Sequence, residues 1–267
     1  MDFEYIDIHS HLYFPDYEPD RERQIEEMKK AKIATISIGT NFETSKMCID
    51  LAEKNQNIFA CVGQHPGDLN TASIFDRDII QLTKNKRVVS IGECGLDYFR
   101  LPVDNKILKE IQKSIFIDHI NLSVETGKPL MLHIRPSPKS FDAYLEALEI
   151  LESKFKEVGD KLKGNAHFFA GDMDILKRFL NIGFTASFTG VITFVKDYDE
   201  FIKYIPNEKI MSETDSPFVA PNPYRGQRNS PLYIPEVVKR IAEIKSEPLE
   251  KVKKALVDTA ISSFGLI

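Results

Sequence analysis

The sequence has few cysteines and no long hydrophobic run. Its three cysteines, Cys48, Cys61 and Cys94, form no CxxC pair. An odd number without paired spacing argues against a disulfide framework and predicts a reducing, cytoplasmic setting. No run approaches the roughly 18 apolar residues of a membrane span, and the acidic first residues, 1–4, lack the apolar region of a signal peptide. We therefore expect a cytoplasmic protein without membrane association.

An excess of positive charge is also absent. The 267 residues include 35 Lys and Arg against 40 Asp and Glu, which gives a formal net charge of −5. Electrostatic binding of nucleic acid over a broad surface needs clustered positive charge, so that mode of binding is excluded, whereas a local basic patch is compatible. With 42% hydrophobic and 28% charged residues, the composition is that of an ordinary globular protein. The length suits one large barrel or two small domains.

Short apolar segments alternate with helical segments along the whole chain, with no linker and no change of composition. The expected strands are 5–8, 33–38, 58–62, 88–93, 129–133, 165–169, 184–188 and 209–213. The expected helices are 21–30, 44–54, 76–84, 105–125, 140–158, 173–181, 199–204 and 235–244, followed by a last helix at 249–262. This alternation predicts an α/β fold, namely a single (β/α)8 TIM barrel over residues 1–267 with an additional C-terminal helix.

A doubly wound open sheet is the alternative fold. That fold is expected to carry a glycine-rich phosphate-binding turn after its first strand. The segment HSHLYF (9–14), which follows the first strand, has no glycine. The barrel is therefore favoured.

Histidines and carboxylates gather at the ends of the expected strands. In a barrel these ends open onto one face, where active sites are built. His9 and His11 lie two residues apart and point to the same side of a strand, as half of a transition-metal site would require. A hydrogen-bonded pair is the alternative for this motif alone, and a cap or loop residue is the alternative for each other position. The predicted metal ligands are His9, His11, Glu93, His133, His167 and Asp215.

This ligand set is too large for one four-coordinate catalytic zinc ion with an open position. It fits two metal ions that share a carboxylate and a water molecule. Glu93, at the end of the fourth expected strand, is a carboxylate that can bridge them. We expect two divalent ions as cofactors, Mg²⁺, Mn²⁺ or Zn²⁺, and four imidazoles favour the transition metals in affinity.

The loop after the last expected strand, residues 213–231, is the second distinctive stretch. It contains four prolines, which stiffen it, and it carries Arg225 and Arg228 over the expected barrel mouth. Guanidinium groups suit phosphate oxygens, and Arg100 and Arg135 add positive charge near the same rim. Salt bridges within the loop are the alternative role for these arginines.

Six segments together resemble the TatD family of metal-dependent deoxyribonucleases, within the amidohydrolase-like barrel group. They are DIHSHLYF (7–14), VGQHP (62–66), IGECGLDYF (91–99), LHIR (132–135), HFFAG (167–171) and ETDSPFVAPNPYRGQRN (213–229), and the last is the most specific. The resemblance implies that His9, His11 and Asp215 hold one metal ion, that His133 and His167 hold the other, and that Glu93 bridges them. It also implies that His65 and Arg225 lie near the substrate phosphate.

Four features depart from the family pattern. Arg135 is followed by Pro136-Ser137-Pro138, Ala170 replaces a usual serine or threonine, His119 replaces a frequent glutamine, and Gln64 replaces an aliphatic residue. All the predicted ligands are retained, so these departures bear on the choice of substrate more than on metal binding.

Other positions receive simpler interpretations. Cys94 and His119 are expected to be buried structural residues. Asp97 and Tyr98 either orient metal ligands or cap the loop that follows them. Asp7, beside the histidine pair, has no assigned role.

The expected function is a metal-dependent phosphodiester hydrolase, a TatD-type exonuclease that uses a metal-activated water at DNA 3′ ends. DNA is the expected partner, and no obligate protein partner is evident. The expected catalytic residues are Glu93, Asp215 and His65, and the expected substrate-binding residues are Arg225, His65 and Arg135. A barrel hydrolase of a carboxylic ester, such as an aminoacyl ester, or of a C–N bond is the alternative, because both reactions stabilise an oxyanion. A non-catalytic binding barrel is disfavoured by the complete ligand set.

Overall fold

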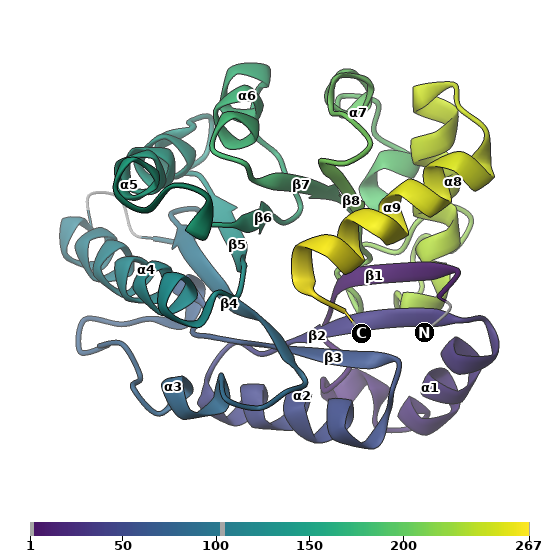
Figure 1. The fold of residues 1–267 in the computed structure, drawn as a ribbon, viewed down its shortest axis with the longest axis horizontal. Helices are drawn as coiled ribbons and strands as arrows, with labels where there is room; N and C mark the ends of the chain where they lie inside the picture. Colours follow the sequence, from purple (N-terminus) through teal and green to yellow (C-terminus); the bar gives the residue numbers. More distant parts are fainter. Residues whose placement is uncertain (1–2, 102–104, 267) are drawn as a thin grey trace.

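Eight parallel strands pair with their neighbours in chain order around a barrel (Figure 1). The computed structural model describes residues 3–101 and 105–266. The strands are β1 (Tyr5–Ser10), β2 (Ile33–Ile38), β3 (Ile58–Val62), β4 (Val88–Asp97), β5 (Leu130–Arg135), β6 (Gly164–Ala166), β7 (Thr185–Phe188) and β8 (Ile210–Ser212). The expected (β/α)8 architecture is confirmed.

Helices alternate with these strands and surround them. They are α1 (Arg21–Lys30), α2 (Phe42–Lys54), α3 (Ile79–Leu82), α4 (Lys106–Thr126), α5 (Asp142–Val158), α6 (Met173–Asn181), α7 (Asp199–Tyr204), α8 (Ile234–Lys245) and α9 (Leu249–Phe264). The last of them is the expected additional C-terminal helix. Within the described residues, no helix is both long and apolar enough to cross a membrane.

Most elements match the expected boundaries, and the exceptions have local causes. The expected helix 76–84 is reduced to the single turn of α3, because Asp76 accepts the backbone N–H of Asp78 and holds a turn there instead. The expected strand 165–169 ends at Ala166, because Phe168 has a φ of 44° in the left-handed region, which a strand does not allow. His167 therefore follows β6 rather than lying within it.

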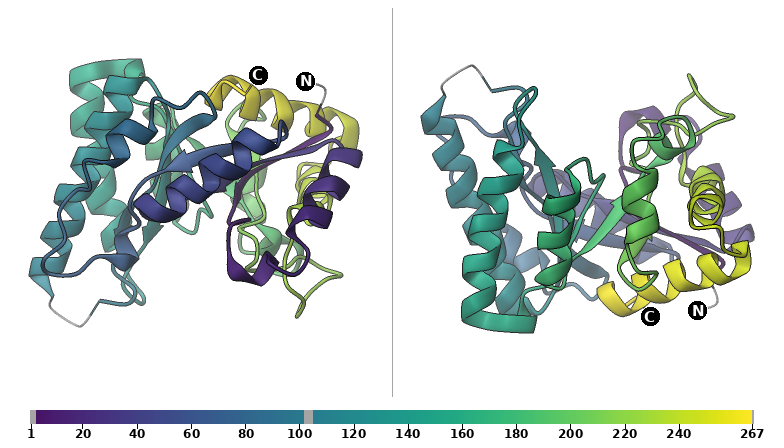
Figure 2. Two further views of the ribbon diagram at one scale, coloured as in Figure 1. Left: turned by 90° about the horizontal axis from the view of Figure 1, so that it is seen from below. Right: turned by 90° about the horizontal axis from the view of Figure 1, so that it is seen from above.

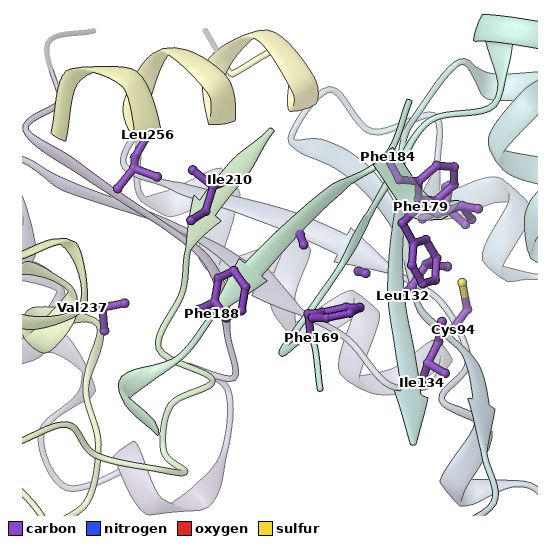
Figure 3. Packing of buried hydrophobic residues seen from close by; sticks show 14 of the residues in the cluster. Cys94, Leu132, Ile134, Phe169, Phe179, Phe184, Phe188, Ile210, Val237 and Leu256 are labelled. Carbon is purple, nitrogen blue, oxygen red and sulfur yellow. The ribbon is translucent and has the colours of Figure 1, made fainter. Parts of the chain in front are cut away.

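Two apolar clusters stabilise the barrel. The larger one lies between the strands and the outer helices, and Figure 3 shows part of it, including Cys94, Phe169 and Phe179. The smaller one combines residues from the strands with Ala260, Phe264 and Leu266 from α9 and its end. Cys94 is buried, as expected.

Helix α9 therefore fills one end of the barrel. Figure 2 shows it on the opposite side of the strands from the long loop that follows β8. The opposite end, where the strands have their carboxyl termini, stays available for a site.

The barrel is closed mainly at the carboxyl ends of β1 and β8. There the Asp215 N–H donates to the His9 carbonyl at 2.9 Å, and the His11 N–H donates to the Ser216 carbonyl at 2.8 Å. The buried Asp7 carboxylate strengthens this seam, because it accepts hydrogen bonds from the backbone N–H of His9 and from both the N–H and the hydroxyl of Thr214. Asp7, which the sequence left unassigned, is thus a structural link that brings Asp215 beside His9.

A register shift in β1 between Asp7 and Ser10 sets the direction of the histidine pair. Strict alternation would put Ile6 and Ile8 on one face and His9 on the other. In the structure Ile6 and Ile8 join the cluster inside the barrel, and the His9 side chain also points inward, toward Glu93. The irregularity in β1 therefore adds the histidines to the interior without removing the isoleucines from it.

Candidate metal centre

Four side-chain groups converge near the end of β1, within β4 and after β8. The expected strand 88–93 continues to Asp97, so Glu93 lies inside β4 rather than at its end. His9 Nε2 lies 3.3 Å from His11 Nε2, 3.5 Å from Glu93 Oε2 and 3.7 Å from Asp215 Oδ1. His11 Nε2 lies 3.8 Å from the same Glu93 oxygen and 3.5 Å from the same Asp215 oxygen. We call these four residues the first ligand group.

The spacing of the first ligand group suits one metal ion. Ligand atoms about 2.1 Å from a metal ion in tetrahedral geometry lie about 3.4 Å from one another. The five distances between 3.3 and 3.8 Å are close to this edge length. Nitrogen and carboxylate oxygen are also the donors that zinc, manganese and iron accept.

The other oxygen of Glu93 faces a second set of residues. Glu93 Oε1 lies 2.9 Å from His133 Nδ1, 3.3 Å from His167 Nε2 and 3.6 Å from His65 Nε2. We call Glu93, His133 and His167 the second ligand group. Since each oxygen of Glu93 serves one group, this buried carboxylate is placed to join two metal positions.

Outer hydrogen bonds determine which ring nitrogens face inward with a lone pair. His133 Nε2 donates to Asp97 Oδ2 at 3.0 Å, and His167 Nδ1 donates to Glu213 Oε2 at 2.7 Å. Whenever such a ring is neutral, its remaining nitrogen is an acceptor, and it points at the negatively charged Glu93. Two facing acceptors repel unless a cation lies between them. A proton between His133 Nδ1 and Glu93 Oε1 can take that place, and so can a bound metal ion. Carboxylates that orient metal-binding histidines in this way are a general feature of metal sites.

His11 is fixed in the same manner, and His9 is the exception. His11 Nδ1 donates to the Ile38 carbonyl at 3.0 Å, so its Nε2 lone pair faces the first ligand group. Within the described residues, His9 Nδ1 is buried without a hydrogen-bond partner, and the ring stacks on that of His167 at 3.7 Å. Packing against His167 therefore holds the His9 ring in place.

The electrostatics of the cluster favour a cation. Burial lowers the pKa of His133, but its hydrogen bonds to Asp97 and Glu93 outweigh burial and raise that pKa to about 9. Burial opposes ionisation of Glu93, yet the surrounding histidines hold its pKa well below the usual range. Glu93 thus remains ionised, and it attracts positive charge at the positions that a metal ion would take.

His65 differs from the predicted ligands in its tautomer. Its Nδ1 accepts the backbone N–H of Gly67 at 3.0 Å. Burial and the neighbouring His133 lower the pKa of His65 to about 3, so the ring is neutral. Its proton must then lie on Nε2, which faces the second ligand group as a donor. This makes His65 better suited to donate a hydrogen bond to a bound oxyanion than to bind a metal ion.

Backbone geometry at Gly92 permits the placement of Glu93. Gly92 has a φ of 147°, and an added Cβ would lie 2.4 Å from the Met131 carbonyl oxygen of the neighbouring strand. Only glycine fits there. Asp215 also has a positive φ, 52°, which for a residue other than glycine often marks a functional site.

Two residues that support the centre, Glu213 and Asp97, lay outside the predicted ligand set or had an open role, and Tyr98, whose role was also open, lies apart from it. Glu213 was missed, although its spacing of two residues from Asp215 places it in the same local pattern. Asp97 performs both of the roles that the sequence left open, because it orients His133 and also accepts the Phe99 N–H at 3.0 Å. Tyr98 does neither, since its hydroxyl donates to Glu146 on α5.

The arginines lie at the rim with different roles. Arg228 is a correction to the expected phosphate contact, because its guanidinium pairs with Asp20 at 2.8 Å and lies over the Tyr17 ring. A long-range ion pair therefore occupies it. Arg225 is exposed and lies 3.6 Å over the Phe194 ring, and Arg135 lies 3.9 Å over the Phe99 ring. Both retain guanidinium edges for a ligand.

His119 anchors the segment that carries His65. It is buried on α4, where its Nδ1 donates to the Ile115 carbonyl and its Nε2 accepts the Gln64 N–H at 3.0 Å. Gln112, also on α4, adds hydrogen bonds to the carbonyls of Pro66 and Asp97. The expected structural role of His119 is thus confirmed, and α4 supports both neighbouring loops.

Acid should destabilise the protein partly through His119. Burial lowers its pKa to about 4, whereas the unfolded chain titrates near 6.5, so stability present above pH 6.5 is lost as the pH falls toward 4. The loss is about 3 kcal/mol. In His119→Gln the amide oxygen can still accept the Gln64 N–H. Urea denaturation at pH 7 and pH 4, with chelator present, should therefore show a smaller pH dependence for the variant. An equal pH dependence of the unfolding free energy in both proteins would contradict this.

Comparisons with known proteins agree on one group of relatives. The model of a family described as TatD related DNase matches residues 6–265. YabD of Bacillus subtilis, an uncharacterized metal-dependent hydrolase, is 33% identical over 265 residues, which cover 98% of this chain and 99% of YabD. YcfH of Escherichia coli, of the same description, is 31% identical over 98% of this chain and 96% of its own length. The crystal structure of the E. coli TatD homologue YjjV superposes with a TM-score of 0.84 at 24% identity, over 99% of both chains.

The strand ends of this barrel gather histidines and carboxylates that could hold metal ions, and YabD and YcfH are both described as metal-dependent hydrolases; the fold and site are those of a metal-dependent hydrolase. The matched family model extends over almost the whole sequence. This chain belongs to the TatD family.

Proposed function

We propose that this protein hydrolyses phosphodiester bonds of DNA, starting from a 3′ end, at a centre of two divalent metal ions. The observation that carries the proposal is the position of Glu93, whose two oxygens face two separate ligand groups. The family description, TatD related DNase, supports DNA as the substrate. Two neighbouring metal ions suit the in-line displacement by which phosphodiesters are hydrolysed.

The residues divide between the two ions as follows. His9, His11 and Asp215 would hold one ion together with Glu93 Oε2, and His133 and His167 would hold the other together with Glu93 Oε1. When bound, such ions polarise phosphoryl oxygens and make a water molecule more acidic. Glu93 would be the carboxylate that both ions share.

Asp215 is the residue proposed to accept the proton of the attacking water. Its side chain is 14% exposed, whereas that of Glu93 is 4% exposed. Asp215 is therefore the carboxylate of the first ligand group that solvent reaches more readily. Its backbone N–H is bound to the His9 carbonyl, which fixes the carboxylate beside the histidine pair.

His65 is proposed to donate an Nε2–H hydrogen bond to a phosphate or leaving-group oxygen. Its tautomer and its neutrality both follow from the hydrogen bond at Nδ1 and from burial. Arg225 and Arg135 are proposed to bind phosphate groups on either side of the scissile one, since their guanidinium planes are already oriented by aromatic rings.

A nuclease assay tests the proposal. Single-stranded oligonucleotides labelled at the 3′ or the 5′ end should lose nucleotides from the 3′ end, the chelated protein should be inactive, and adding Mg²⁺, Mn²⁺ or Zn²⁺ should restore cleavage. Cleavage that survives chelation, or its absence with every metal, would contradict the proposal. Hydrolysis of aminoacyl esters or of C–N bonds in place of DNA would then favour the alternative reaction of the same centre.

A further inference from the structure

The exposed phenylalanines gather on the face that carries the predicted metal ligands. Among the described residues, the phenylalanines with large exposed fractions are Phe99 at 45%, Phe141 at 40% and Phe218 at 48%. Phe99 follows the carboxyl end of β4, Phe141 follows that of β5, and Phe218 follows that of β8. Apolar rings in water are unfavourable, and their concentration on one functional face indicates a ligand surface.

Phe218 stands beside the first ligand group. It comes three residues after Asp215, and its ring centroid lies 6.2 Å from that of His11 at an interplanar angle of 68°. The half-buried Phe14 supports it at 5.7 Å and 86°, and Phe14 itself stacks with His11 at 5.0 Å. Neither contact of Phe218 is a parallel stack. The ring is thus held in position next to a predicted metal ligand while much of its surface stays open.

Phe99 has the same relation to the second ligand group. Its backbone N–H donates to Asp97, the carboxylate that orients His133. The guanidinium of Arg135 lies over the ring at 3.9 Å, which combines an aromatic surface with positive charge. The open part of the Phe99 ring therefore lies close to a cation that suits a phosphate group.

We propose that Phe218 and Phe99 are platforms on which the nucleobases flanking the scissile phosphate stack. This inference rests on the proposed DNase function. Open aromatic rings accompanied by arginine are how proteins bind single strands, because every unpaired base offers a π face and stacking tolerates any sequence. Bases of an intact duplex are already stacked on their neighbours. The platforms therefore select unpaired DNA.

Binding measurements separate the platforms from the chemistry. The probe is a 5′-fluorescein oligothymidylate with phosphorothioate linkages, which resist hydrolysis, and the readout is fluorescence anisotropy with the metal-loaded protein. Phe218→Ala and Phe99→Ala should each bind about tenfold more weakly, and Phe218→Trp should retain binding. Phe141→Ala is the matched control. Phe141 has a similar exposed fraction, but among the described residues its ring contacts no predicted metal ligand and has no arginine over it, unlike Phe218 and Phe99.

A second probe carries abasic sugars at its 3′ end. Wild type should bind it as weakly as the two alanine variants bind the normal strand, and those variants should lose little further affinity for it. If Phe218→Ala and Phe99→Ala bind the normal strand as tightly as Phe141→Ala does, the proposal that these rings are stacking platforms is overturned. If the two alanine variants lose binding but the wild type cleaves no DNA, the platforms are supported and the proposed nuclease activity is contradicted. If the wild type cleaves DNA but the variants bind as tightly as it does, only the platforms are overturned.

Discussion

Replacement of Glu93 by glutamine is expected to abolish hydrolysis while leaving the barrel folded. Glutamine has nearly the same shape, so the buried side chain should still fit. It removes the negative charge that both ligand groups share, and its amide presents a donor where a metal ion needs an oxygen. We expect kcat/KM to fall by about 10³-fold or more, with less than two metal ions bound per chain.

The measurements for this variant are steady-state kinetics, metal content and circular dichroism. Glu146→Gln is the control, since Glu146 is a partly exposed carboxylate on α5 that binds Tyr98 and Lys113 away from the ligand groups. It should keep full activity. Metal-dependent turnover that persists in Glu93→Gln, with normal metal content, would remove Glu93 from the bridging position.

Loss of the outer carboxylates is expected to weaken the second ligand group selectively. In Asp97→Asn or Glu213→Gln the new amide can donate to the histidine nitrogen, which moves the imidazole proton toward Glu93 and blocks the lone pair that a metal ion requires. Affinity for one of the two ions should fall roughly 10–100-fold, and activity should fall with it. The ion held by His9, His11 and Asp215 should bind as before.

Metal titration by calorimetry, with activity followed in parallel, would distinguish the two ions. Ser187→Ala is a useful comparison, because it removes one hydrogen bond to Glu213 and leaves the contact between Glu213 and His167 in place. It should cost much less affinity. Equal weakening of both ions in Glu213→Gln would show that the carboxylate supports the whole centre rather than one histidine.

Local patterns in the sequence predicted which segments form helices and strands better than they predicted where those helices and strands begin and end. Apolar segments bounded by polar and turn residues located β2, β3 and α6 with their observed boundaries. The contraction of the expected helix 76–84 to α3 depends on a side-chain hydrogen bond at Asp76. Such a contact depends on the conformation already adopted, and hydrophobic periodicity does not record it.

The grouping of the site residues was predictable from topology, and their hydrogen-bond partners were not. A barrel brings all strand ends to one face, so His9 and Asp215 meet although His9 lies in the first strand of the barrel and Asp215 follows the last. Arg228 shows the limit of this reasoning, because no pattern in the sequence near Arg228 predicts its ion pair with the distant Asp20. The role of Glu213 could have been inferred from its place two residues before Asp215, whereas the inward turn of His9 required the irregularity in β1.

The closure of the barrel has a mechanical consequence. The ring of paired strands is closed where the backbone of β1 meets the segment after β8. The backbone hydrogen bonds there involve His9, His11, Asp215 and Ser216. The same residues supply much of the first ligand group. The position of Asp215 beside the histidine pair therefore depends on the same hydrogen bonds that close the barrel, and a change that breaks them should disturb the closure and the first ligand group together.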